Sequence, residues 1–373
     1  TNTFIRSTYP PHSKRTSVCR FSLDSEFIFD IMESKDSAVS STGGSAEKPS
    51  PLWRGFFMKP FKTIDEQIAI LKQRGLLIPN EIRARFCLLE NNYYNIINGY
   101  SKFFPMQGDI YTNGTTFDEV ICLYMIDSEI KQAFFKAILT AESHLKSIFS
   151  YRFAQEFPQL SYPYLDILCY DPQKTLDVMS TIHRLSGIIN RQSRIRQSSI
   201  SHYLSNYGNV PIWVLIGYLD FGELRYMLDS THTHIQNNVA KDMMMYVHQH
   251  IPACPIFPPE IMLAFLANIN ELRNVCAHNN RMIGFQCRRD DKYFQPLHSL
   301  HGISATDSRR DAYSVYLSLQ CFMGMSDFAK LHNTLRKRIR YFSHQLQTIN
   351  MADVLIQLGF PCSWHTTASK LPQ

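Results

Sequence analysis

The chain has 373 residues, of which 45% are hydrophobic and 13% aromatic, so it can bury a substantial core in one large domain or two. Its net charge of +6 makes it mildly basic, which fits an anionic partner without establishing one. No segment reaches the ~18 apolar residues of a membrane-spanning helix, which excludes such a helix at the level of sequence.

The nine cysteines are scattered, with no C-x-x-C pair and an odd total. This usage is typical of reduced thiols, and together with a beginning that lacks a signal-peptide layout it predicts a cytoplasmic protein. Two H-x-H pairs, His232/His234 and His248/His250, lack nearby cysteines and the i,i+4 spacing of two ligands on one helix face. We therefore expect no metal site and no cofactor.

Residues 1–57 differ in composition from the rest of the chain. They include SAVSSTGGSAEKPS, a run of the kind that stays flexible, and Met58 follows shortly after it. We expect Met58 to be the native start, with residues 1–57 a non-native extension or, alternatively, a disordered tail. Residues 58–350 would then form the helical domain, followed by a C-terminal helix and tail over 351–373.

The first elements after Met58 are predicted to be short helices. Thr63 with Glu66 is typical of a capped start, and Gly75 of a stop, which predicts one helix between them. Residues 81–92 predict a second helix. An aromatic band follows, which could form core or stack on bases: Tyr93, Tyr94, Tyr100, Phe103 and Phe104.

Apolar residues at helical spacing predict one long helix from Phe117 toward Phe157, capped by Thr115-Thr116. Glu142 and Lys146 lie inside it, four residues apart. They could form a solvated ion pair, or they could face a catalytic groove if this helix packs beside the helix of residues 257–281.

The region from Gln159 to about Pro211 is less regular, punctuated by Pro163, Pro172 and Gly187. It concentrates three cations among Ser and Gln, namely Arg191, Arg194 and Arg196. A mobile basic loop could bind RNA phosphates, and a solvated loop is equally compatible with the residues. Beyond it, residues 210–228 predict one or two buried helices with a break near 217–222, and residues 239–250 predict another helix.

Residues 257–281, FPPEIMLAFLANINELRNVCAHNNR, predict one buried helix with a polar end. Two prolines and Glu260 suit its start, and the apolar stripe has helical spacing: Ile261, Phe265, Ile269, Leu272 and Cys276. Arg273, Asn274 and His278 arrive together at its end. They could be catalytic, or Arg273 and His278 could simply satisfy the last carbonyls of the helix.

Asn274 and His278 are four apart and share one helix face, whereas Arg273 and His278 lie roughly 140° apart on an ideal helix. In a single protomer, Arg273 and His278 would therefore not both reach the same substrate atom easily. A bend after Ala277, or a groove shared by two symmetry-related helices, would bring them together.

After the central helix, a polar loop over residues 285–308 carries Arg288 and Arg289. Residues 312–331 and 335–349 are expected to be helices, the second with a solvated surface of four cations: Arg336, Lys337, Arg338 and Arg340. A last helix is expected over 352–358, ending at Gly359 and followed by a frayed tail. No internal repeat is visible and little period-two alternation occurs, so the predicted class is all-α.

RNVCAH resembles the R-N-x-x-x-H signature of HEPN ribonucleases. The wider sequence resembles the Abi family of abortive-infection proteins from Met58 to about Phe285, in blocks such as KPFKTIDEQIAILKQRGL, NNYYNIINGY and HYLSNYGNVPIWVLIGYLDFGEL. The resemblance implies a HEPN-like helical bundle with additional helices and a toxin that cleaves RNA in phage defence. It also implies an RNA partner, which for such toxins includes a small non-coding antitoxin RNA.

On this interpretation Arg273, Asn274 and His278 are catalytic, and Glu142, Lys146, Asn279 and Arg281 support the groove. Arg191, Arg194, Arg196, Arg288 and Arg289 would bind RNA. His278 would move protons and Arg273 would clamp the phosphate, without metal, in a homodimer that supplies two histidines. The alternative is a non-catalytic HEPN-like dimer that binds structured RNA or a protein partner.

Overall fold

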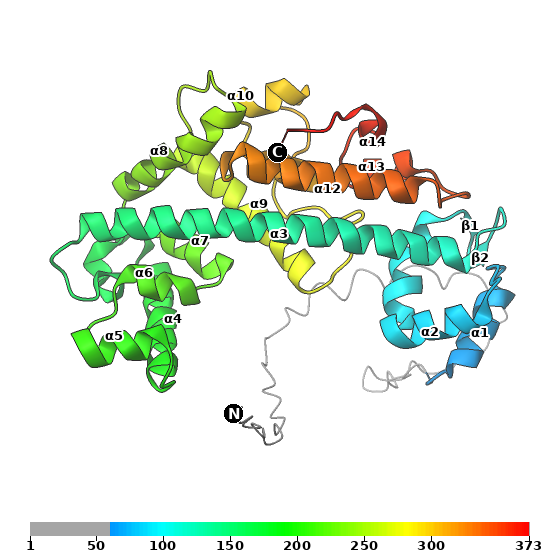
Figure 1. The fold of residues 1–373 in the computed structure, drawn as a ribbon, viewed down its shortest axis with the longest axis horizontal. Coiled ribbons are helices and arrows are strands. Elements are labelled where there is room, and N and C mark those ends of the chain that lie inside the picture. The colour runs from blue at the N-terminus through cyan, green and yellow to red at the C-terminus, as the bar shows by residue number, and fades with distance from the viewer. Residues whose placement is uncertain (1–59, 373) are drawn as a thin grey trace, which may run out of the picture. The chain divides into compact units, whose positions relative to one another are not determined.

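A computed structural model describes residues 60–372, and the predictions for residues 1–57 lie outside this range. The regular elements of the described residues are helices apart from a two-stranded antiparallel sheet, β1 (Met106–Gln107) and β2 (Ile110–Tyr111). The predicted all-α class is therefore confirmed (Figure 1). None of the helices between residues 60 and 372 combines the length and apolar character that a membrane crossing requires.

The first two helices begin where the capping pattern predicts. α1 (Ile64–Gln73) follows Thr63, whose hydroxyl accepts from the backbone N–H of Glu66 while the Glu66 carboxylate accepts from the N–H of Thr63. α2 (Glu81–Asn91) is capped by the side chain of Asn80. A π-helical turn, η2 (Tyr94–Asn98), and a 3₁₀ turn, η3 (Ser101–Phe103), follow.

The aromatic band divides between packing and exposure. Tyr100 and Phe104 are buried in the core, which accounts for them without a ligand. Tyr94 is 64% exposed, so its ring remains accessible to solvent.

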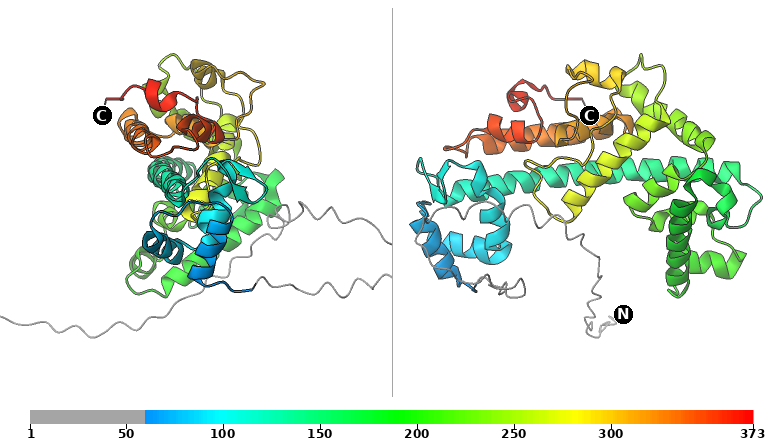
Figure 2. Two further views of the ribbon diagram at one scale, coloured as in Figure 1. Left: turned by 90° about the vertical axis from the view of Figure 1, so that its right-hand side faces the viewer. Right: turned by 180° about the vertical axis from the view of Figure 1, so that it is seen from behind.

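The predicted long helix is present as α3 (Phe117–Glu156), whose 40 residues span about 60 Å at about 1.5 Å per residue. A capping box between Thr116 and Glu119 fixes its start. The helices with the most extensive packing against it are α6 (Ile212–Leu215), α8 (Thr233–His250), α9 (Pro259–Ala277) and α12 (Met325–Ser343). Figures 1 and 2 show α3 running through the centre of this group.

The region expected to be irregular after Gln159 contains a full helix, which corrects the prediction. Three 3₁₀ turns, η4 (Pro163–Leu165), η5 (Ile167–Cys169) and η6 (Pro172–Lys174), lead into α4 (Thr175–Ser193). Its buried residues Val178, Leu185 and Ile188 have helical spacing, and Gly187 lies inside the helix without ending it. α5 (Ser199–Tyr207) then follows the basic turn.

The break predicted near residues 217–222 is confirmed. α6 passes into a 3₁₀ turn, η7 (Ile216–Tyr218), and α7 (Phe221–Asp229) starts at an Asp220–Glu223 capping box. α8 starts at Thr233, six residues before the predicted Val239, because Ile235 already belongs to the stripe that Val239 and Met243 continue.

The helix boundaries after residue 285 differ from those predicted. α10 (Gln295–His298) and η8 (Ser299–His301) interrupt the loop, and α11 (Ala312–Ser318) with η9 (Leu319–Cys321) ends well before Leu331. α12 then begins after an extended Gly324 and runs unbroken to Ser343. Phe322 and Met323 lie in the break between the two helices and are buried. Because they are apolar, the sequence suggests one continuous helix where the backbone is interrupted.

The C-terminal tail is ordered against α12, not frayed. α13 (Met351–Gln357) ends before Gly359 as predicted, and α14 (Trp364–Thr367) follows. Arg336 Nε donates to the Ala368 carbonyl at 2.7 Å, and Arg340 Nε donates to the His365 carbonyl. These two cations are therefore tail contacts, which corrects the prediction that all four cations of this helix are solvated.

Candidate active site

α9 carries Arg273, Asn274 and His278, which we call the motif residues. It begins at Pro259 after Pro258 and crosses α3, as the front and back views both show (Figures 1 and 2). The predicted apolar stripe is buried at Ile261, Phe265, Ile269 and Leu272. Packing against α3, α7, α8 and α11 thus fixes the helix axis, and its last turn projects the polar end.

The helix ends in a Schellman motif, in which two backbone N–H groups close the last carbonyls. The N–H of Asn280 donates to the carbonyl of Val275 at 3.0 Å, and that of Asn279 donates to the carbonyl of Cys276 at 3.3 Å. Asn279 has φ +53°, a left-handed conformation that asparagine tolerates better than most residues. His278 is the residue at which the helix ends.

This geometry bears on the structural alternative for Arg273 and His278. The carbonyls of Asn274, Val275 and Cys276 accept backbone N–H groups, and neither side chain donates to them among the hydrogen bonds of the described residues. These three carbonyls are therefore capped without Arg273 or His278.

The three motif residues differ in their surroundings. Arg273 Nη1 lies 3.4 Å from Asn274 Oδ1, and Arg273 Nε is buried with no hydrogen-bond partner. Asn274 and His278 are exposed. No hydrogen bond joins Arg273 to His278 within residues 60–372, as expected for side chains roughly 140° apart around a helix.

A buried ion pair of α3 holds the turn after the helix, residues 278–283, which we call the motif turn. Asp127 Oδ1 accepts from the N–H groups of Met282 at 3.0 Å and Ile283 at 2.8 Å. Lys131 Nζ lies 3.1 Å from Asp127 Oδ2 and donates to Asn279 Oδ1 at 2.7 Å. Both charged groups are almost fully buried, and their mutual contact with the turn satisfies them.

Tyr100 completes this cluster by donating to Asp127 Oδ2 at 2.7 Å. Burial, and then the charge of Asp127, raise the pKa of Tyr100 well above its usual value, so the hydroxyl remains a donor. Burial likewise raises the pKa of Cys276 to about 12, so this thiol beside the motif residues is neutral.

The sequence pattern gave no role to Asp127 or Lys131, and it placed Tyr100 only in the aromatic band. One signal was present: Asp127 and Lys131 are four apart on a helix, directly beside the buried Ile126 and Ile130. Charged residues on a buried helix face require partners, and the motif turn that they bond lies 148 to 156 residues further along the chain, which spacing alone does not reveal.

Asn279 and Arg281, which were predicted to support the groove, make contacts that fix the motif turn. Asn279 accepts from Lys131, as described. Arg281 Nε donates to the Ile283 carbonyl at 3.0 Å and Nη1 donates to the Gly99 carbonyl at 2.5 Å. Arg281 therefore joins the turn to η2.

Glu142 and Lys146 form an ion pair of 2.7 Å on α3, and both are largely shielded from solvent. Lys146 Nζ also donates to the Leu219 carbonyl at 2.6 Å, just before α7. Glu142 Oε2 is buried with no hydrogen-bond partner. The predicted packing of α3 beside α9 is confirmed, and no hydrogen bond links this pair to the motif residues.

The residues predicted to bind RNA occupy two loops. Arg191, Arg194 and Arg196 lie at the end of α4 and in the turn before α5, and none forms an ion pair with another described residue. Arg288 and Arg289 are exposed in a loop that runs back along α9. The loop is held there because the Arg288 N–H donates to Glu271 and the Arg289 carbonyl accepts from Asn268. Glu271 and Arg273 lie roughly 160° apart around α9, so this loop borders the opposite face of the helix.

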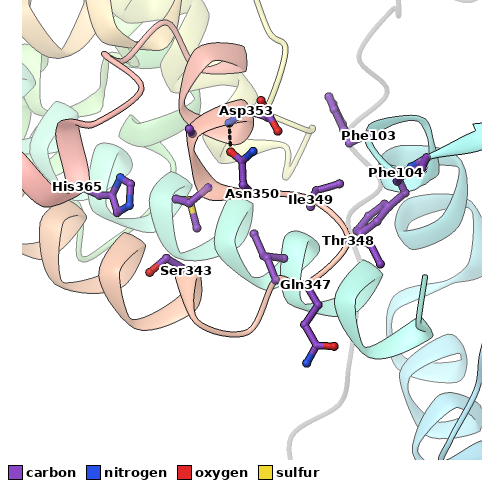
Figure 3. A pocket seen from close by; sticks show the side chains of 13 residues that line it. Phe103, Phe104, Ser343, Gln347, Thr348, Ile349, Asn350, Asp353 and His365 are labelled. Atoms are coloured by element: carbon purple, nitrogen blue, oxygen red, sulfur yellow. Dashed lines mark hydrogen bonds between the residues drawn. The ribbon is translucent and has the colours of Figure 1, made fainter. Parts of the chain in front are cut away.

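The described residues form a pocket of about 900 Å³ (Figure 3). Its wall comes from η3 on one side and from the segment between α12 and α13 on the other, with Phe103, Phe104, Gln347 and Asn350 among the lining residues. It contains none of the predicted site residues.

Comparison with known protein families finds a match for this chain. The family model described as Abi-like protein matches residues 87–284, which is more than half of the chain and runs from α2 through the motif residues. No curated protein and no solved structure matches. The chain belongs to the Abi-like protein family.

Proposed function

We propose that this protein is a metal-independent endoribonuclease whose active site is built on the end of α9. Membership of the Abi-like family suggests a role in abortive-infection defence against phage, in which such an enzyme would act as a toxin. The observation that carries the proposal is the end of α9, where Asn274 and His278 are exposed and Arg273 Nη1 lies 3.4 Å from Asn274 Oδ1. Backbone N–H groups bond the carbonyls of Asn274, Val275 and Cys276, so the side chains of Arg273 and His278 are not needed to cap them.

The proposed chemistry uses the nucleophile that RNA itself supplies. His278 takes a proton from the 2′-OH or gives one to the departing 5′-oxygen, a role that imidazole side chains commonly have in general acid–base catalysis. Arg273 stabilises the charge that develops on the non-bridging phosphate oxygens, and Asn274 orients the imidazole or the phosphate. The products carry 2′,3′-cyclic phosphate and 5′-OH ends, and DNA is not cut.

The same geometry supports a homodimer. Arg273 and His278 diverge on one helix, so a single copy aims them at one phosphate poorly. A two-fold axis that pairs the α9 ends would put Arg273 of one copy near His278 of the other and supply both a base and an acid.

The test is cleavage of mixed cellular RNA in EDTA by wild type, His278→Ala and Arg273→Ala. Each substitution should lower the rate by about 10²-fold or more, the scale of a lost general base or oxyanion donor. The matched control is His344→Ala, because His344 is also an exposed residue at a helix end, that of α12. His344→Ala should cleave at the wild-type rate.

The alternative function is RNA or protein binding without turnover. Intact RNA that co-purifies with wild type, together with full cellular toxicity of His278→Ala, would favour it over the enzyme. Cleavage that needs Mg²⁺ or leaves a 3′-OH would exclude the proposed mechanism.

A further inference from the structure

Two cations converge on one aromatic ring beside the motif turn. Lys102 Nζ and the guanidinium carbon of Arg281 each lie 5.3 Å from the centroid of the Phe103 ring. Arg281 is three residues beyond His278, and Lys102 comes from η3, more than 170 residues earlier in the chain. The fold therefore brings together two charges of like sign at the edge of the candidate active site.

Arg281 is held in a fixed orientation. Its Nε and Nη1 donate to the carbonyls of Ile283 and Gly99, and it is half-buried. The remaining Nη2 has no partner among the hydrogen bonds of the described residues. A guanidinium fixed in this way can present a donor to an anion with little further loss of freedom.

No acidic side chain balances the pair. Neither Lys102 nor Arg281 takes part in an ion pair with any other residue of 60–372. Burial, and then the charge of Arg281, lower the pKa of Lys102, and no carboxylate opposes this shift. Adjacent like charges without a counterion destabilise the free protein, and a bound anion would relieve that repulsion.

We propose that Lys102 and Arg281 form a phosphate subsite that holds the RNA backbone next to the phosphate bound at Arg273 and His278. This subsite deepens the proposed function, because it assigns a second contact to the same substrate. Phe103 also lines the pocket of Figure 3, which provides a concave surface for a nucleotide that follows the bound phosphate. The two proposed phosphate contacts fit single-stranded RNA better than an acidic peptide, because every nucleotide of an RNA strand carries a phosphate.

The experiment measures binding of a fluorescent RNA oligonucleotide with 2′-O-methyl groups throughout, which cannot undergo transesterification. Affinity is measured across a series of KCl concentrations for wild type, Lys102→Ala, Lys102→Arg and Lys337→Ala. Lys102 is exposed, so its substitution does not threaten the fold, and Lys337 is an exposed lysine of α12 that forms no ion pair with the described residues. Lys337→Ala is therefore the matched control.

Lys102→Ala should bind several-fold more weakly than wild type, and the slope of log affinity against log salt should fall by about 0.7, the value for one phosphate contact on a single strand. Lys102→Arg should keep most of the affinity, and Lys337→Ala should match wild type in both quantities. Equal affinity and slope for Lys102→Ala and wild type would overturn the subsite, as would an equal loss in Lys337→Ala.

This assay separates the subsite from the ribonuclease. If wild type binds the oligonucleotide with the expected Lys102 dependence but cleaves no RNA, the subsite stands and the catalytic proposal fails. If wild type cleaves RNA while Lys102→Ala leaves KM and the salt slope unchanged, the catalytic proposal stands and the subsite fails.

Discussion

At the residue scale, Asp127 and Lys131 determine where the motif turn lies. They join the first half of α3 to backbone and side-chain atoms of residues 279–283, so a buried charge pair fixes the turn that follows His278. A buried pair of this kind contributes precision of geometry more than net stability. Removal of one member leaves the other charged and unpaired.

Asp127→Ala is therefore expected to lower the free energy of unfolding by about 3–5 kcal/mol, the cost of breaking a buried pair. Urea denaturation followed by circular dichroism measures it. The control is Arg338→Gln, which removes a pair with Glu129 of 3.1 Å that is partly exposed on both sides and should cost at most about 1 kcal/mol. Equal losses in the two variants would show that the buried cluster is not the anchor of the turn.

His298 makes stability depend on pH. It is fully buried, and burial lowers its pKa to about 4. Between about pH 6.5 and 4 the unfolded chain binds a proton that the folded chain does not, so stability falls as the pH falls through this window. The loss attributable to His298 reaches about 3 kcal/mol at pH 4.

Comparison of unfolding free energies of wild type and His298→Gln at pH 7, 5.5 and 4.5 tests this dependence. The variant should show a shallower decline, whatever its stability at pH 7, while His344→Gln at an exposed position should keep the wild-type decline. Parallel curves for wild type and His298→Gln would refute it.

At the element scale, sequence identified the helices whose starts are encoded locally. α1, α3 and α7 begin at capping boxes that need only residues three apart, and α9 follows its apolar stripe and its two prolines. α4 was not predicted because Gly187 and the polar residues around it weaken the helical signal in the sequence. The helix forms because its buried side chains, among them Val178, Leu185 and Ile188, pack against the core. The break before α12 was not predicted because Phe322 and Met323 are apolar and extend the apparent helical pattern. These two side chains are buried in the core although they lie outside a helix.

The candidate site divides in the same way. Arg273, Asn274 and His278 were found from a local pattern, whereas Asp127, Lys131 and Lys102 reach the site only through contacts between segments far apart in the chain. Spacing in one sequence carries no information about such contacts. The prediction of a frayed tail was wrong for the same reason. The tail is held by arginines of α12 that donate to its carbonyls, and these contacts join segments that spacing does not connect.

The order of the tail gives a prediction at this scale. Trp364 is 7% exposed and packs against Tyr316, His332 and Phe360, so Trp364→Ala should cost about 3–5 kcal/mol of stability. Trp213→Ala is the matched control, because that side chain is 59% exposed and should cost about 0.5 kcal/mol or less. Similar melting temperatures for Trp364→Ala and Trp213→Ala would mean that the tail does not stabilise the fold.

At the scale of the whole molecule, the proposed mechanism requires two copies of the chain. If each active site uses His278 from both copies, co-assembly with an inactive His278→Ala subunit should reduce activity as the square of the wild-type fraction. Co-expressed, differently tagged subunits purified at known ratios measure this dependence. A linear decline would mean that each protomer cleaves independently, and the dimeric site would then be wrong.

The most direct test of the central claim is the end chemistry of RNA fragments produced by the purified protein in EDTA. We predict 2′,3′-cyclic phosphate and 5′-OH ends that disappear in His278→Ala and Arg273→Ala and persist in His344→Ala. Fragments with 3′-OH ends, or cleavage that survives both motif substitutions, would contradict a ribonuclease site at the end of α9.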